Sequence, residues 1–328
     1  MEDYKLSSIS NYSNNNEKCM LIIDPEAYSE QFPFKKVSNS WHNKFLYFGL
    51  EGAKAWYSVS EDPVYSDPQR EDKIIDVFNN LLKDLHSKIF ISLGPGNAKL
   101  DLELIKILKR RNKTIKYIPV DISDALLFWA IVTISSEVNV PFGILTDIEE
   151  RLYFIKNKIF EISLRPKIFT LIGNTLGNLQ INEKTFLDEL SSVMEIDDFF
   201  LLNVSTITKQ WKLFLDPRMK YENYTNSIKF FLTRGISIHT GESTKWLIKN
   251  FTKVVGFRHN KRINNNISEV IEIYDKRNDR LITRISRYLF ENLVNWINER
   301  KDFQIIFSHQ LIENNVIGDG FLLIKKLK

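Results

Sequence analysis

Short apolar runs alternate with longer amphipathic stretches between residues 88 and 204. The runs have the length and composition of strands, and the stretches between them have helical spacing. Strands that alternate with helices imply right-handed crossovers and a parallel sheet covered on both faces. The sequence therefore predicts an α/β fold. The strand-like runs are 88–93, 115–120, 140–145, 167–173 and 199–204, and the helical patterns are about 99–110, 123–136, 148–157 and 182–195.

The segments on either side of this alternation follow a different pattern. Residues 20–80 are rich in aromatic residues, and residues 7–18 are rich in serine and asparagine, which is typical of a mobile tail. Residues 205–262 are mainly helical in spacing. We therefore expect an α/β core that carries an N-terminal segment and an insertion. Strand-like runs return later, at 268–274, 280–286, 303–310 and 320–326.

Composition narrows the class of protein. Of 328 residues, 43% are apolar, which is enough for a sizeable core, yet no run reaches the ~18 apolar residues of a membrane span. The N-terminus lacks the layout of a secretory signal, and a single cysteine, Cys19, excludes an internal disulfide, so we expect a cytoplasmic protein. The net charge of +4 is spread along the chain, which argues against a nucleic-acid partner.

Two glycines flank a proline where the first strand-like run ends, in the sequence LGPGN. Gly94 and Gly96 place backbone N–H groups and the start of a helix at the carboxyl edge of the sheet. A dinucleotide favours a third glycine, as in G-x-G-x-x-G, but Lys99 stands there. S-adenosylmethionine (SAM) has no phosphate and needs only a close approach of the backbone. The pattern favours SAM, and a tight turn without a ligand is the alternative.

Acidic residues follow the next two strand-like runs. Asp121 ends the second run, about 25 positions beyond Gly96, where an acid can accept both hydroxyls of a ribose. Alternatively, Asp121 and Ser123 only cap the next helix. Asp147 follows the third run and can accept the adenine amino group while Ile148 covers the ring, or it too is a helix cap. The fourth run ends in LIGNTLGNL, which either presents polar amides to a substrate or merely makes turns.

These motifs together resemble the histidine-specific, SAM-dependent methyltransferase family, whose best-known members make trimethylhistidine in ergothioneine biosynthesis. LGPGNAKLDLELIKIL, YIPVDIS, TDIEERL and LIGNTLGNL occur in the family's order and spacing. The resemblance covers roughly residues 45–328 and is tightest over 90–180. It implies a class I (Rossmann-like) methyltransferase core with a second domain, formed by the N-terminal segment and an insertion after strand five, and a substrate between the two.

The resemblance also implies a division of the chain and a set of partners. We expect SAM as the cofactor, a small amine or amino acid as the substrate, and a monomer or weak homodimer that binds neither nucleic acid nor membrane. The expected parts are a disordered tail (1–18), the N-terminal part of the substrate-binding domain (19–80), the SAM-binding core (81–204), the substrate-domain insertion (205–275) and C-terminal strands that complete the core (276–328).

Individual residues match positions with known roles in the family. Asn178 resembles an asparagine that holds the substrate's α-amino and carboxylate groups, and Tyr47 and Tyr65 fall where tyrosines approach the amino group. Tyr221 resembles a third, carboxylate-binding tyrosine; ordinary aromatic packing is the alternative for all three. We expect Tyr47 and Asn178 to act in catalysis, and no metal site. The residues expected to bind SAM are Gly94, Gly96, Asp121, Asp147, Ile148 and Gly173.

The sequence departs from the family at three kinds of position. Ser92 stands where many class I methyltransferases have an acid, and Ala98 replaces the third loop glycine. Two stretches, 239–246 and 283–288, compete for the family's histidine-reading segment. We prefer the second, because a helix and the closing strands follow it. Ser286 then matches the family's serine, and Arg284 stands where the family has a glutamate that reads the imidazole.

Arg284 shapes the expected activity. A guanidinium offers five donors and no acceptor, so it suits anions rather than a cationic histidine. We therefore expect a SAM-dependent methyltransferase that N-methylates a small amino-acid-like substrate other than free histidine. The alternatives are a histidine N-α-methyltransferase proper, a SAM-binding protein without catalysis, a nicotinamide dehydrogenase, and a methyltransferase of RNA or protein.

Overall fold

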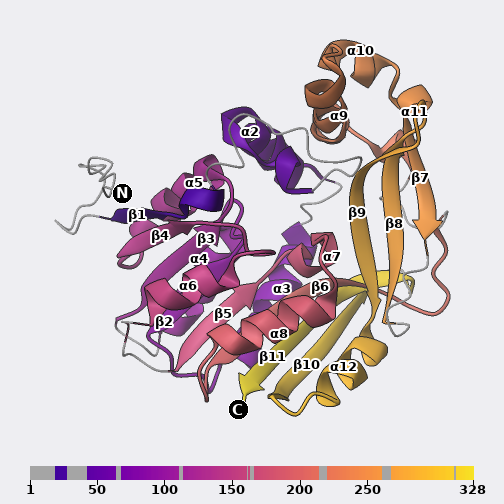
Figure 1. The fold of residues 1–328 in the computed structure, drawn as a ribbon. Coiled ribbons are helices and arrows are strands. Elements are labelled where there is room, and N and C mark those ends of the chain that lie inside the picture. The colour runs from indigo at the N-terminus through magenta and orange to yellow at the C-terminus, as the bar shows by residue number, and fades with distance from the viewer. Residues whose placement is uncertain are drawn as a thin grey trace.

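The computed structural model describes residues 19–27, 43–63, 68–110, 114–160, 162, 166–213, 220–260, 267–313 and 315–328. Within these residues one sheet of eleven strands runs through the molecule (Figure 1). The strands are β1 (Met20–Ile23), β2 (Ile89–Leu93), β3 (Lys116–Asp121), β4 (Phe142–Leu145), β5 (Lys167–Leu171), β6 (Phe199–Ile207), β7 (Val255–Asn260), β8 (Ser268–Asp275), β9 (Arg280–Leu289), β10 (Phe303–Glu313) and β11 (Ile317–Lys326).

Helices lie between most of these strands and on both faces of the sheet (Figure 1). They are η1 (Asn43–Leu46), α2 (Gly49–Ser60), α3 (Pro68–Leu81), α4 (Lys99–Lys109), α5 (Asp124–Ser135), α6 (Leu152–Ile159), α7 (Thr175–Asn178), α8 (Glu183–Val193), η4 (Tyr221–Asn223), α9 (Asn226–Thr240), α10 (Thr244–Lys249), α11 (Phe251–Val254) and α12 (Phe290–Asn298).

The central strands have the order β4-β3-β2-β5-β6 and are all parallel. This is the order 3-2-1-4-5 of a doubly wound sheet, and β11 and β10 extend it with an antiparallel pair. The predicted α/β class with a Rossmann-like core is therefore confirmed. The strand order reverses between β2 and β5, and in such sheets ligands bind beyond the carboxyl ends of the strands at this point.

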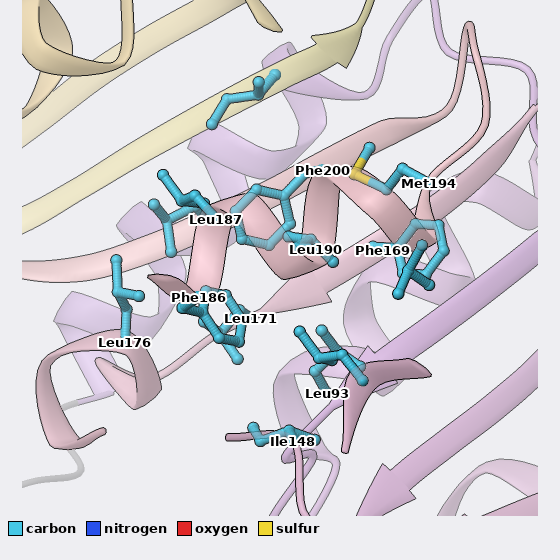
Figure 2. Close-up of a cluster of buried hydrophobic side chains, with 14 of the residues drawn as sticks. Leu93, Ile148, Phe169, Leu171, Leu176, Phe186, Leu187, Leu190, Met194 and Phe200 are labelled. Atoms are coloured by element: carbon cyan, nitrogen blue, oxygen red, sulfur yellow. The ribbon is translucent and has the colours of Figure 1, made fainter. Parts of the chain in front are cut away.

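Two hydrophobic clusters hold the core together, one on each face of the sheet. All five residues of β2 are buried, which is typical of a parallel strand covered on both sides. Because side chains alternate along a strand, Ile89, Ile91 and Leu93 pack with α6, α8 and α12, while Phe90 packs with α3, α4 and α5. Figure 2 shows part of the first cluster, with Leu93 and Ile148 lying side by side.

Strand β6 changes its neighbour halfway along its length. Its residues 199–202 pair with β5, whereas Thr206 and Ile207 pair with Tyr288 and Leu289 of β9. Strand β9 pairs with β8, and β8 pairs with β7, both in the antiparallel sense. These strands lie beside the insertion helices α9 and α10 (Figure 1). Strands β5 and β9 therefore diverge, and α7 lies between them, packed against β9 and β6.

The N-terminal segment and the insertion share a third hydrophobic cluster. It joins residues of η1 and α2 to residues of α9, α10 and α11 and to residues of β7, β8 and β9. Helix α2 also packs against α5 of the core, so it covers the sheet edge from above. The predicted division into domains stays a prediction, although this shared cluster is what its second domain requires.

Two strands were absent from the sequence analysis. Strand β1 pairs in parallel with β4 and forms one edge of the sheet, and β7 pairs with β8 at the other end. None of the four residues of β1 is buried, and burial in β7 ends before Phe257, so neither strand has the buried run that marked the central strands. Pairing with a distant partner, not a local pattern, defines such strands.

A buried ion pair fastens β1 to the core. Asp24 is fully buried, and Arg151 donates from Nε to its Oδ2 at 2.7 Å and from one terminal nitrogen to its Oδ1 at 3.0 Å. The Thr146 hydroxyl donates to the same carboxylate at 2.8 Å. Burial works to raise the pKa of Asp24, but these donors outweigh it and lower the pKa. The ionised form of Asp24 is therefore stabilised by these donors, and removing them would leave a buried charge without a partner.

We predict that Arg151→Met lowers the free energy of unfolding by about 3 kcal/mol, because it leaves a buried carboxylate without its main partner. Denaturant unfolding at pH 7 measures this change. The double variant Arg151→Met with Asp24→Asn should recover part of the loss, since it removes the buried charge as well. If the wild-type protein and Arg151→Met were equally stable, the ion pair of Asp24 and Arg151 would not stabilise the fold.

Candidate functional site

The glycine turns at the ends of β2 and β5 are the centre of the candidate site. Gly94, Gly96 and Gly173 all adopt positive φ angles, +66°, +57° and +76°, where a side chain is strained. A Cβ on Gly94 would lie 3.4 Å from Thr175 of α7 and 3.8 Å from Ile148, and a Cβ on Gly173 would meet nothing within 4 Å. The space beside the backbone is therefore open at Gly173, whereas Thr175 and Ile148 line the turn at Gly94.

Asp121 lies at the tip of β3 and faces the same turn. Its side chain is buried, and it accepts the N–H groups of Gly96 and Ser123, the latter at 2.9 Å. Burial is the main cause that raises its pKa to about 7, and the backbone donors oppose it. The cap of α5 is Ser123, whose hydroxyl accepts from Leu126 N–H. Asp121 is therefore tied to the glycine turn, as a ribose-binding acid would be.

Asp147 and Ile148 begin the loop after β4. Ile148 is buried in the core and reaches toward Gly94. The Asp147 carboxylate accepts the Glu149 N–H at 2.8 Å and the Lys44 ammonium at 2.6 Å. Lys44 is a residue of η1 and is itself buried, so this ion pair joins the N-terminal segment to the expected adenine loop.

Helix α7 brings the second set of predicted residues together. Asn174 at its start donates to the backbone carbonyl of Ser286 at 3.4 Å and accepts the Ser205 N–H at 2.9 Å. Gly177 lies so close to β9 that a Cβ on it would be 2.6 Å from the Ser286 carbonyl oxygen. Asn178, one residue later, is half-buried. The Ser286 side chain is fully buried, and its hydroxyl has no hydrogen-bond partner among the described residues.

Tyr47 stands beside the glycine turn in an aromatic cluster. Its ring centroid lies 5.4 Å from those of Trp56 and Phe231. The Trp56 indole nitrogen would be 3.1 Å from a Cβ on Gly96, so this cluster reaches the cofactor turn. Arg234 of α9 donates to the Leu46 and Phe48 carbonyls and so fixes the backbone on both sides of Tyr47. Tyr65 lies outside the described residues.

Arg284 belongs to a row of charges across three strands. Glu272 of β8 is opposite Arg258 on one side and Arg284 on the other. Its carboxylate is buried and accepts Nε of Arg258 at 2.6 Å and Nε of Arg284 at 3.0 Å. Arg258 also pairs with Asp279. Because residues two apart on a strand share a face, Arg284 and Ser286 point to the same side of β9.

Tyr221 lies elsewhere. Its ring packs against Phe257 and Phe251, and its hydroxyl donates to the Val255 carbonyl at 2.7 Å. Phe257 alternates to the face of the strands opposite Arg258, so the structure does not bring Tyr221 together with Arg284 and Ser286. The contacts of Tyr221 are those of aromatic packing, and its role toward a substrate carboxylate stays a prediction.

Ser92 and Ala98 depart from the family pattern in the cofactor loop, and the structure shows the surroundings of Ser92 and the backbone conformation of Ala98. Ser92 donates to Asp101 of α4, a fully buried acid that also accepts the Tyr117 hydroxyl. An acid therefore lies next to Ser92 in space, although it points into the core between α4 and the sheet. Ala98 adopts a φ of +56°, so this chain keeps the left-handed turn that glycine would favour and carries the strain of a side chain.

Three residues near the site were missed by the sequence analysis: Lys44, Glu149 and Arg234. Each acts through a partner far away in the chain, and Lys44 and Arg234 lie in stretches without a motif. Glu149 lies within TDIEERL, directly after the two residues expected at the adenine, and that position was the one available signal.

The chain belongs to the histidine-specific, SAM-dependent methyltransferase family, whose model matches residues 34–214, more than half of the chain. SAM is therefore the cofactor, and the protein is a SAM-dependent methyltransferase. The site fits this cofactor, because the glycine turn after β2 lies at the switch point and its Gly96 N–H is hydrogen-bonded to the buried acid Asp121.

Solved methyltransferases resemble the structure only distantly. An O-methyltransferase from Bacillus cereus in complex with SAH shares 8% identity over 91% of this chain and 96% of its own, with a TM-score of 0.41. A 1,6-didemethyltoxoflavin-N1-methyltransferase from Burkholderia thailandensis shares 10% identity over 85% of this chain and 89% of its own, with a TM-score of 0.44. A comparison with curated proteins gives no match.

The described residues show neither a membrane-spanning helix nor a metal-binding cluster. None of their helices combines the length and apolar character needed to cross a bilayer. No cluster of three His, Cys, Asp or Glu side chains in the same part of the chain is arranged to hold a metal ion. The cytoplasmic location and the expected partners stay predictions.

We predict that Asp121→Asn weakens SAM binding about tenfold, because a charged acceptor of hydrogen bonds is replaced by a neutral one. Isothermal calorimetry measures the affinity. Asp101→Asn is the matched control, since Asp101 is equally buried but points away from the turn, and its SAM affinity should be unchanged. An unchanged affinity for Asp121→Asn would sink the ribose assignment.

The same variant should raise the stability of the protein without cofactor at pH 8. The pKa of Asp121 in the folded state, about 7, lies above the unfolded value, so ionisation destabilises the fold as pH rises from about 4 to 7. The destabilisation caused by ionised Asp121 is fully present above about pH 7 and absent below about pH 4. Thermal unfolding at pH 8 and pH 4 should therefore show a gain for Asp121→Asn only at pH 8.

Proposed function

We propose that this methyltransferase transfers a methyl group to the amine of a small amino-acid-like acceptor other than free histidine. The observation that carries the proposal is the arrangement at β9. The buried Ser286 hydroxyl, which has no hydrogen-bond partner within the described part of the chain, lies beside the α7 turn, and Arg284 lies on the same face two residues away. Asn178 would then hold the α-amino and carboxylate groups of the acceptor, and Arg284 would select its side chain.

The chemistry requires mainly orientation from the protein. Bound SAM supplies a methyl group on a positively charged sulfur, which is open to in-line attack by a neutral amine. Tyr47 and Asn178 would direct the lone pair of that amine, and α2 and the aromatic cluster around Tyr47 would exclude water. Holding two reactants in line accounts for a large part of such a rate enhancement.

Charge argues against free histidine. The side chain of Arg284 is about one-third exposed, and its pairing with Glu272 fixes the guanidinium on this face of β9. A permanently charged donor group disfavours an imidazolium and favours a carboxylate or another acceptor. The family description supports histidine as a second candidate, in which case Arg284 and Glu272 would serve only to pin the strands together.

Mass spectrometry of the purified protein with SAM and a panel of amino acids tests the proposal. The expected result is a +14 mass step, or several, on an amino acid with an anionic or acceptor-rich side chain and little modification of histidine. Efficient Nα-methylation of histidine would favour the second candidate. SAM binding with no transfer to any member of the panel would favour a protein that has lost catalysis.

We predict that Asn178→Ala lowers use of the acceptor about tenfold or more, because the head group loses hydrogen bonds to the amide. SAM affinity should stay within about threefold of the wild-type value. Initial rates and calorimetry on the same preparation separate the two effects. An equal collapse of SAM binding would show that Asn178 is structural.

A charge exchange at Arg284 should change the acceptor. The single variant Arg284→Glu would set two carboxylates side by side with Glu272, so we pair it with Glu272→Gln. This double variant should gain histidine methylation if position 284 reads the side chain of the acceptor. Glu272→Gln alone is the matched control and should not gain it. Equal acceptor profiles in all three proteins would remove Arg284 from the acceptor site.

A further inference from the structure

Glu149 connects two loops of the site that are far apart in the sequence. Its side chain is buried, and Oε2 accepts the N–H groups of Gln180 at 2.7 Å and Ile181 at 3.2 Å. These two amides follow Asn178 by two and three residues. Glu149 itself follows Asp147 and Ile148, the residues expected to contact the adenine. One carboxylate therefore spans from the cofactor loop to the end of the acceptor turn.

The cofactor side of this link is held in place by two further contacts. Asp147 accepts the Glu149 N–H at 2.8 Å and the Lys44 ammonium at 2.6 Å, and Lys44 also lies 3.6 Å from Glu150. The loop is therefore anchored to η1, three residues before Tyr47. A ligand that restrains residues 147–149 therefore also acts on Glu149, whose carboxylate accepts the N–H groups of Gln180 and Ile181.

We propose that Glu149 is a positioning residue that transmits cofactor binding to the acceptor turn. SAM bound against Asp147 and Ile148 restrains their loop, Glu149 then holds the N–H groups of Gln180 and Ile181 more tightly, and Asn178 is fixed for the acceptor. The proposal rests on the proposed function, because it takes Asn178 as the residue that holds the acceptor.

The charge of Glu149 decides how strongly it holds the turn. Burial, and then repulsion from Asp147, raise its pKa to about 7, while the two N–H groups and the Lys44 ammonium act in the opposite direction. An ionised carboxylate accepts a hydrogen bond more strongly than a neutral carboxyl group. The link should therefore be strong above pH 7 and weaken as pH falls through this value.

Hydrogen exchange resolved to single amides tests the link without any acceptor. In the wild-type protein at pH 8, saturation with SAM should slow exchange at Gln180 and Ile181 about tenfold. Glu149→Gln should lose most of this slowing, while calorimetry shows SAM affinity within about threefold of wild type. Glu189→Gln on the neighbouring helix α8 is the matched control and should behave as the wild-type protein does.

A pH series on the wild-type protein gives an independent measurement if Glu149→Gln folds poorly. With SAM saturating at each pH and intrinsic exchange rates divided out, the slowing at Gln180 and Ile181 should be several-fold smaller at pH 6 than at pH 8. Equal slowing in the wild-type protein and Glu149→Gln, or slowing that does not change with pH, would overturn the inference alone. Failure of the wild-type protein to bind SAM would overturn the proposed function with it.

Discussion

The site depends on how the sheet parts where β5 ends. Beyond Leu171 strand β5 no longer pairs with β6, and two asparagine side chains link the segments that separate here. Asn203 accepts the Gly173 N–H at 3.0 Å, and Asn174 accepts the Ser205 N–H while donating to the Ser286 carbonyl. Buried backbone groups must be paired. These amides therefore allow β5 to leave, β9 to arrive, and α7 to lie between them against the cofactor turn.

Two buried acids lie at the carboxyl edge of the sheet, Asp121 at the tip of β3 and Glu149 in the loop after β4. The pKa values of Asp121 and Glu149 rise to about 7, and burial is the main cause for both. An ordinary core would replace such groups with apolar ones, because each ionised form destabilises the fold. Perturbed acids gathered at one edge of a sheet are typical of a functional site, and here each acid also accepts backbone N–H groups that shape a turn. The acids therefore position the backbone at a cost in stability.

Local patterns were enough to predict the α/β core, while the residues predicted to bind SAM stay predictions. Buried parallel strands leave unbroken apolar runs, and the turn at Gly94 and the acid at Asp121 follow them directly in sequence. The edge strand β1, the ion pair of Lys44 with Asp147, and the row through Glu272 were not predictable in this way. Each depends on a partner more than ten residues away, and a lysine or glutamate has the same local signature whether it pairs in the core or points to solvent.

The row of Arg258, Glu272 and Arg284 bears most directly on the acceptor. A buried carboxylate between two guanidiniums is stable only if both remain near, so Glu272 and Arg284 constrain each other. Glu272 is thereby occupied and is a poor acceptor for an imidazole N–H, even though it lies next to the position where the family has its glutamate. Arg258 also pairs with Asp279, so its guanidinium is shared between two carboxylates. Arg284 lies on the face of β9 that carries Ser286, so in the proposed function an acceptor at the α7 turn would meet a guanidinium held in place by Glu272.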